Sequence, residues 1–171
     1  DVKVTINGAT FTDNYAQDDG GALYLRHVEL ELTNGTFTDN STDEDGGAIA
    51  MFSEDYARAD ARITGSTFTG NNSEENGGAI YAFGQNLYLT GVNTFTNNWS
   101  SENMADEDDA DGGAIWFKGD RGYGYFFDGW DTSLLTQNQT DAFLEISGTA
   151  TFTGNWAGDR DSYLNNPQDM N

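Results

Sequence analysis

Apolar and polar residues alternate in five short segments of the chain. These segments are residues 2–6, 28–32, 59–63, 87–89 and 144–146. An alternation with a period of two puts every second side chain on the same face of an extended strand, so each segment predicts a β-strand with one buried face. A glycine follows each segment and predicts a turn at its end: Gly8, Gly35, Gly65, Gly91 and Gly148.

Two further patterns recur in a constant order. The pattern Thr-Phe-Thr-x-Asn begins at Thr10, Thr36, Thr67, Thr94 and Thr151. The pattern Gly-Gly-Ala followed by Ile or Leu begins at Gly20, Gly46, Gly77 and Gly112, and it has no fifth copy. The first four phenylalanines of the Thr-Phe-Thr pattern are 26, 31 and 27 residues apart. A period of this size indicates a repeat architecture.

Each repeat therefore holds three predicted strands separated by turns, and it cannot bury its apolar face alone. Stacking of successive repeats at the ~4.8 Å strand spacing produces one continuous core. The sequence predicts an all-β fold, a right-handed parallel β-helix of about five coils, because parallel crossovers are nearly always right-handed. A β-hairpin meander is the alternative, but it requires two-residue turns and a period of about ten residues.

The repeated phenylalanines are expected to stack inside the tube, with the flanking threonines outside. The repeated asparagine is expected to satisfy backbone groups at a corner and to bond to the asparagine of the next coil. The glycine pair suits a corner that requires positive φ or close packing of chain on chain. We expect residues 1–171 to form a single domain with a loop insertion at about 118–142.

The charge of the chain excludes some classes of binding partner. The net charge is −22, with 29 acidic residues against seven Lys and Arg, so nucleic acid and anionic membrane surfaces are unsuitable partners. Solubility at a cell surface and a high-salt habitat both account for this charge. No apolar run approaches the ~20 residues of a membrane-spanning helix. The chain contains no cysteine and begins at Asp1 inside a predicted strand, which indicates either a removed targeting segment or a piece of a longer solenoid.

Acidic residues gather just before each glycine pair, and stacking is expected to place them above one another. Carboxylates are the hard oxygen ligands that calcium prefers, so calcium is a candidate cofactor. A solvated acidic edge is the alternative interpretation. The candidate metal ligands are Asp18, Asp19, Asp43, Asp45, Glu74, Asp108, Asp109 and Asp111.

The insertion at 118–142 is rich in aromatic residues. Tyr123, Tyr125 and Trp130 are candidate ligand-binding residues for a surface glycan or a protein, because binding residues often lie on loops of a rigid scaffold. The alternative is a small satellite core against the side of the tube. Among the Asn-x-Ser/Thr sequons, Asn34 and Asn138 are the expected glycosylation sites, since the other three are corner asparagines.

The phrase Phe-x-x-Asn followed by Gly-Gly-Ala-Ile resembles the repeat of chlamydial polymorphic outer-membrane proteins and related β-helix surface proteins. The resemblance covers four full copies, from Phe11 and Asn14 to Phe95 and Asn98 with their glycine pairs, and a half copy at Phe152 and Asn155. It implies an extracellular right-handed β-helix used in surface display, adhesion or self-assembly. Such repeats are scaffolds, so the resemblance does not specify one activity.

The leading functional hypothesis is a non-catalytic, extracellular structural or adhesive protein that self-associates. Strand edges at the two ends are expected to stack head to tail into a homo-oligomeric filament or surface stalk. The self-association residues are Val2, Val4, Ile6, Tyr163 and Leu164. No catalytic residue is proposed, since the single histidine, His27, has no Ser or Cys partner in the pattern.

Two alternatives remain open. One is a carbohydrate-active β-helix enzyme or polysaccharide binder, because paired carboxylates on a β-helix face serve such chemistry. The other is an ice-binding solenoid, since two outward columns of threonine, from Thr10 and Thr12 to Thr151 and Thr153, form a regular lattice of hydroxyl groups. Threonine is also an ordinary residue on exposed strands.

Overall fold

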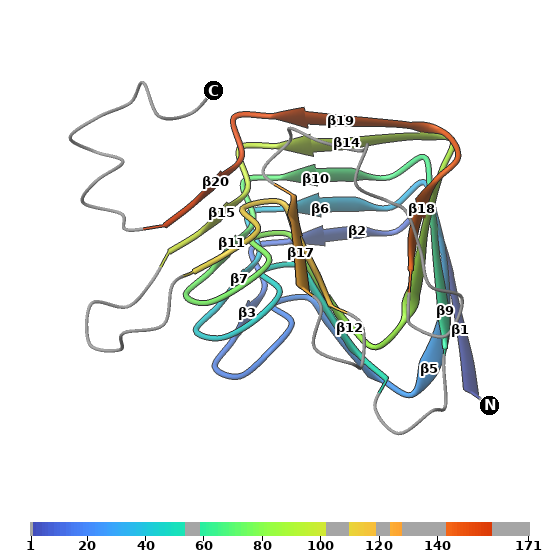
Figure 1. Ribbon diagram of the computed structural model, residues 1–171, viewed down its shortest axis with the longest axis horizontal. Coiled ribbons are helices and arrows are strands. Elements are labelled where there is room, and N and C mark those ends of the chain that lie inside the picture. Colours follow the sequence, from blue (N-terminus) through green and yellow to red (C-terminus); the bar gives the residue numbers. More distant parts are fainter. Residues whose placement is uncertain (1, 54–58, 102–109, 119–123, 128–142, 159–171) are drawn as a thin grey trace.

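The computed structural model describes residues 2–53, 59–101, 110–118, 124–127 and 143–158, with the backbone alone for 124–127. Its strands form four five-stranded sheets, which we name A to D in the order in which the chain first meets them. Successive strands of sheets A to C, and the first four strands of sheet D, come from successive coils, so the molecule is a parallel β-helix (Figure 1). The fold class predicted from the sequence is confirmed.

The alternating segments form sheet A, and the Thr-Phe-Thr segments form sheet B. Sheet A contains β1 (Val2–Asn7), β5 (Val28–Thr33), β9 (Asp60–Thr64), β13 (Asn86–Thr90) and β18 (Leu144–Ile146). Sheet B contains β2 (Thr10–Thr12), β6 (Thr36–Thr38), β10 (Thr67–Thr69), β14 (Val92–Thr96) and β19 (Thr149–Thr153). All neighbouring strands in these two sheets are parallel.

Each of the first four coils contains one more strand than the three expected. The additional strands form sheet C and have two residues each: β3 (Tyr15–Ala16), β7 (Ser41–Thr42), β11 (Asn72–Ser73), β15 (Trp99–Ser100) and β20 (Trp156–Ala157). They follow the corner asparagine, whose hydrogen bonds hold adjacent coils at strand spacing. Two residues are too few for a hydrophobic alternation, so this sheet has no periodic signal in the sequence.

Sheet D holds the apolar segments that follow the glycine pairs. Its strands are β4 (Leu23–Arg26), β8 (Ile49–Phe52), β12 (Ile80–Phe83), β16 (Ile115–Lys118) and β17 (Gly124–Phe127). The first four are parallel to one another, whereas β17 pairs with β16 antiparallel. The segment predicted as a loop insertion therefore contributes the fifth strand of sheet D, since it turns back onto the strand that precedes it.

The core is a column of stacked side chains. Phe11, Phe37, Phe68, Phe95 and Phe152 stack with ring centroids 4.7–5.0 Å apart and interplanar angles of 2–10°. The three interior rings are fully buried, whereas Phe11 and Phe152 at the two ends are only partly buried. Because the rings stay almost parallel, sheet B has little twist from coil to coil.

The corner asparagines form a hydrogen-bonded ladder that runs along the tube from coil to coil. In each step the backbone N–H and side-chain Nδ2 of one asparagine donate to Oδ1 of the asparagine in the next coil. For Asn40 and Asn71 these distances are 3.1 and 2.8 Å. The second Nδ2 hydrogen of Asn71 goes back to the Phe37 carbonyl oxygen, at 3.1 Å. Asn40, Asn71 and Asn98 are fully buried, which confirms the predicted corner role.

The glycine pair is required at its corner for two different reasons. The first glycine of each pair has a positive φ, for example +74° at Gly46 and +69° at Gly77. The second glycine packs directly on the next coil, so a Cβ at Gly78 would overlap the backbone oxygens of Gly113 and Trp99. Only glycine satisfies both conditions without moving the coils apart.

Candidate functional site

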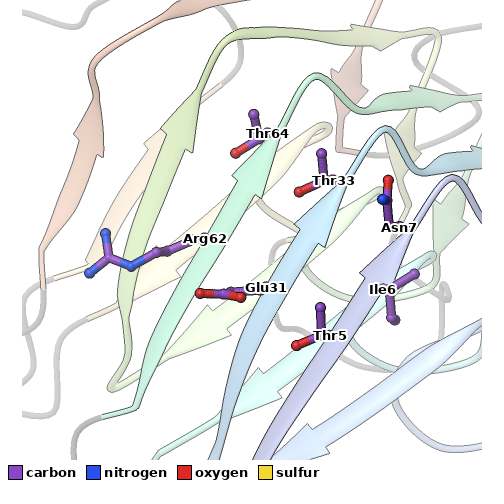
Figure 2. A pocket seen from close by; sticks show the side chains of 7 residues that line it. All are labelled: Thr5, Ile6, Asn7, Glu31, Thr33, Arg62 and Thr64. Carbon is purple, nitrogen blue, oxygen red and sulfur yellow. The ribbon is translucent and has the colours of Figure 1, made fainter.

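A shallow pocket lies on the outer face of sheet A. It has a volume of about 280 Å³ and crosses the first three strands of the sheet (Figure 2). Its lining residues are Thr5, Ile6 and Asn7 from β1, Glu31 and Thr33 from β5, and Arg62 and Thr64 from β9. Parallel pairing places Thr5, Glu31 and Arg62 in one row, and Asn7, Thr33 and Thr64 in the next.

The two charged groups of this pocket are both held by other residues. The Glu31 carboxylate accepts from Lys3 Nζ at 2.7 Å. Arg62 Nη2 donates to Asp60 Oδ2 at 2.6 Å, and the guanidinium lies 3.9 Å from the centre of the Tyr88 ring. These contacts direct Glu31 toward β1 and Arg62 toward β13, so the pocket between them carries paired charges of both signs.

The outer face of sheet B carries the two threonine columns expected from the sequence. Thr10, Thr36, Thr67, Thr94 and Thr151 are register partners in one column, and Thr12, Thr38, Thr69, Thr96 and Thr153 in the other. All ten side chains are at least partly exposed. The face is therefore a neutral array of hydroxyl and methyl groups with the spacing of the strands.

The first and last described coils expose apolar residues that are buried in the interior coils. At the N-terminal end, Val2 is 64% exposed, and Val4, Ile6 and Phe11 are partly buried. At the other end, Ile146, Ala150 and Phe152 are partly buried. The predicted self-association residues Tyr163 and Leu164 lie outside the described residues.

The acidic loops contain a ladder of their own, at the residue directly before each glycine pair. The backbone N–H of Asp45 donates to Asp19 Oδ1 at 3.3 Å, and Asn76 donates to Asp45 Oδ1 through its N–H at 2.9 Å and its Nδ2 at 3.1 Å. The Asp111 N–H then donates to Asn76 Oδ1 at 3.1 Å. Asp19 and Asp45 therefore have a structural role, because their side chains accept backbone hydrogen bonds from the next coil.

Burial changes the acidity of this ladder. Desolvation raises the pKa of Asp45 to about 7, and the hydrogen bonds from Asn76 reduce this effect. Desolvation also raises the pKa of Asp19 and, with help from Asp45, that of the Tyr81 hydroxyl. Burial and the neighbouring Asp19 raise the pKa of Glu44. The stacked loops therefore favour protonated carboxyl groups.

The structure describes six of the eight predicted calcium ligands. Of the predicted ligands, Asp18, Asp43 and Glu74 lie in the same loops as the ladder, and Asp43 accepts a 2.5 Å hydrogen bond from the Tyr15 hydroxyl. Among the described residues, no group of three or more acidic or histidine side chains is arranged to hold a metal ion. Asp108 and Asp109 lie outside these residues, so calcium binding stays a prediction.

The other predicted site residues are only partly described. Tyr125 lies in β17, where the backbone alone is described, while Tyr123, Trp130 and Asn138 lie outside the described residues. Asn34 is exposed and has a φ of 52°, which is compatible with its predicted glycosylation. His27 is exposed at a turn with a φ of 54°.

Sequence reasoning missed an aromatic column on the outer face of sheet D. Tyr24, Phe52, Tyr81 and Trp116 follow one another at centroid distances of 5.4, 5.1 and 4.4 Å. The sequence did contain a pattern that indicates this column: an aromatic residue stands between two apolar residues that face the core, for example Tyr81 between Ile80 and Ala82. The missed pocket on sheet A had no comparable signal, because its residues come from three separate coils.

The geometry defines the chain as a parallel β-helix repeat protein. Four segments match the Chlamydia polymorphic membrane protein (Chlamydia_PMP) repeat, at residues 8–26, 34–50, 65–82 and 94–118. These four matches confirm the resemblance to this repeat that the sequence showed. No curated protein and no solved structure matches the chain. In the described part of the chain, no helix has the length and apolar character needed to span a membrane.

Proposed function

We propose that this protein is a non-catalytic structural and adhesive β-helix of the cell surface, and that its copies associate end to end. The surface location is supported by the repeat type, whose family is named for membrane proteins of Chlamydia. The main observation in favour of end-to-end association is the polarity of the asparagine ladder, since its two ends are complementary to each other.

The ladder has donors at one end and acceptors at the other. Within the tube, Asn98 gives its N–H and one Nδ2 hydrogen to Asn155 Oδ1, at 3.0 and 2.9 Å. In the same step Asn155 Nδ2 returns a hydrogen bond to the Phe95 carbonyl oxygen, at 3.0 Å. If a second copy stacks on the last coil, Asn155 repeats these bonds to Asn14 of that copy. Asn14 Nδ2 then donates to the Phe152 carbonyl oxygen.

The apolar groups of the two ends are complementary as well. Stacking places Phe152 of one copy against Phe11 of the next, which continues the ring column at its 4.7–5.0 Å spacing. Burial of both rings contributes to the association free energy, on the order of 25 cal/mol per Å² of apolar surface removed from water. Contacts of this heterologous kind do not close, so their product is an open filament.

Negative-stain electron microscopy and light scattering test this proposal across a range of protein and salt concentrations. We expect filaments for the wild type and at least ~10-fold weaker association for Asn14→Ala, which removes the acceptor at one end. Thr67→Ala is the control, because Thr67 lies on the third coil, between Thr36 and Thr94, and therefore away from both ends. Monomers under all conditions would contradict the proposal.

A second candidate function, ice binding, is favoured by the threonine columns of sheet B. The small interplanar angles of the phenylalanines beneath this face indicate a flat and regular array, and a crystalline ligand requires such regularity. Thermal hysteresis of dilute solutions is the measurement. Thr67→Tyr should abolish the activity, whereas Thr33→Tyr on sheet A should retain it; a wild type without thermal hysteresis excludes this function.

A further inference from the structure

We propose that the pocket on sheet A binds one sugar unit of a neutral glycan. This inference rests on the proposed adhesive function and names its ligand. The pocket lies on the outer face of the first three coils, and its first strand, β1, is the edge strand of sheet A at the N-terminal end. Glu31, Thr33, Arg62 and Thr64 lie on the second and third coils, behind that edge.

The depression results from the alternation of long and short side chains on this face. Thr33 and Thr64 are register partners and form a low row, while Glu31 and Arg62 form the taller row beside them (Figure 2). All of these residues lie on strands of one five-stranded sheet, so the pocket is already formed before a ligand arrives. A preformed site reduces the ordering cost of binding.

The lining groups match the hydrogen-bonding capacity of a sugar. Thr33 and Thr64 supply hydroxyls, Asn7 an amide, Glu31 a carboxylate and Arg62 a guanidinium. A hydroxyl group of a sugar both donates and accepts, so it can pair with any of these groups. The planar amide of Asn7 and the carboxylate of Glu31 can each bind two neighbouring sugar hydroxyls, and threonine methyl groups can contact the C–H face of the ring. The Arg62 guanidinium, held over the Tyr88 ring, borders the pocket on the side of β13 (Figure 2).

The charges around the pocket favour a neutral ligand. Lys3 neutralises Glu31 at 2.7 Å, and Asp60 neutralises Arg62 at 2.6 Å. An anionic glycan would compete with Glu31 and Asp60 and would approach a protein of net charge −22. An apolar ligand would leave the polar lining without hydrogen bonds, which is unfavourable.

The size of the pocket limits what it can hold. Its volume of about 280 Å³ lies at the lower end of ligand pockets, which suits a single ring-sized unit. A longer chain must continue over the open face of the sheet. Tyr88, which lies beyond Arg62 on β13, is positioned to meet a following unit.

Saturation-transfer NMR and affinity titration test the inference with defined oligosaccharides. The neutral probes are cellohexaose, laminarihexaose and mannohexaose, and the anionic comparison is hexagalacturonate. We expect at least one neutral probe to bind, and its affinity to exceed that for hexagalacturonate. The affinity should fall at least ~10-fold in Thr33→Tyr, which fills the pocket, and in Glu31→Gln, which removes a charged acceptor.

Thr69→Tyr is the matched control, because it introduces the same side chain on the outer face of sheet B. It should bind the neutral probe with the affinity of the wild type. The inference is overturned if no neutral probe binds, if Thr33→Tyr binds as the wild type does, or if hexagalacturonate binds as tightly. Filament formation by the same variants is measured separately, so a failure of the pocket is distinguished from a failure of end-to-end association.

Discussion

Asp45 shows how the position of a single residue in the stack changes its chemistry. The equivalent residues of the neighbouring coils are Asp19 and Asn76, so the same site accepts either a carboxyl or an amide group. Burial raises the pKa of Asp45 from the ordinary 3.8 to about 7, although the hydrogen bonds from Asn76 oppose this shift. A raised pKa means that the folded state holds the proton more tightly than the unfolded state does.

This raised pKa predicts a loss of stability with increasing pH. The contribution of Asp45 is fully present below its unfolded pKa of 3.8 and is lost as the pH rises through about 7. Asp45→Asn should therefore stabilise the protein at pH 8 by roughly 2 kcal/mol, after allowance for solvent screening, and have little effect at low pH. Thermal unfolding between about pH 4 and pH 8 is the measurement.

Asp13→Asn is the control for Asp45→Asn. It removes one negative charge at an exposed corner with a φ of 53°. It should not reproduce the pH-dependent gain. Equal effects of both variants would assign the gain to net charge and contradict the role of burial.

The asparagine ladder permits a second prediction at the residue scale. Asn71→Ala removes the acceptor of Asn40 and the donor to Phe37, and both lie in the buried part of the corner. Unpaired buried polar groups cost about 1–3 kcal/mol each, so unfolding should become easier by about 3 kcal/mol or more. Asn14→Ala, at the exposed end of the ladder, should cost about 1 kcal/mol or less in urea-induced unfolding. Similar costs at both positions would contradict the ladder.

At the scale of the element, close contact between coils depends on glycine. The second glycine of each pair lies against backbone atoms of the next coil, and its φ is not in the left-handed region. Glycine is therefore required at this position because no other residue leaves enough space between the coils. Gly8 presents the opposite case, with a φ of +66° and no atom within 4 Å of the place that a Cβ would occupy.

These two glycines give a matched pair of variants. Gly78→Ala should push the third coil away from Trp99 and Gly113 of the fourth coil, and it should destabilise the protein by more than ~2 kcal/mol, because the overlap is with backbone atoms that cannot rotate away. Gly8→Ala should cost only the ~1 kcal/mol of a left-handed alanine. Circular dichroism during thermal unfolding compares them. The steric explanation is wrong if Gly8→Ala is the more damaging change.

At the scale of the whole molecule, stacking concentrates negative charge along one edge of the tube. The loops before the glycine pairs lie on successive coils, and the protein has a net charge of −22. Self-repulsion of this kind destabilises the compact state and also opposes the association of two copies. Salt reduces the repulsion, because the Debye length falls from about 30 Å at 0.01 M to about 3 Å at 1 M.

We therefore expect the melting temperature and the filament length to rise with sodium chloride from about 0.01 M to about 1 M. Differential scanning calorimetry and electron microscopy measure the two quantities. Calcium chloride at equal ionic strength is the comparison that separates specific binding from screening. A melting temperature that does not change with salt would contradict the electrostatic explanation.

The repeated residues are sufficient to determine the architecture. Phenylalanine, asparagine and glycine at constant positions are local requirements for core filling, corner satisfaction and close approach, and each is visible in one repeat. Their recurrence predicted the β-helix, the buried Phe68 and the buried Asn71, all of which the structure confirms. The threonine columns followed from the same period.

Other features depend on the register between coils, that is, on which residues of adjacent coils lie next to each other. Unequal repeat lengths leave that register undefined in the sequence, so Ser66 and Asn93 did not predict the buried hydrogen bond of 2.9 Å between them. The antiparallel pairing of β17, the pKa of Asp45 and the pocket between Glu31 and Arg62 are likewise consequences of three-dimensional neighbours. The sequence by itself determined what each coil is made of, and the tertiary structure decided what adjacent coils place side by side.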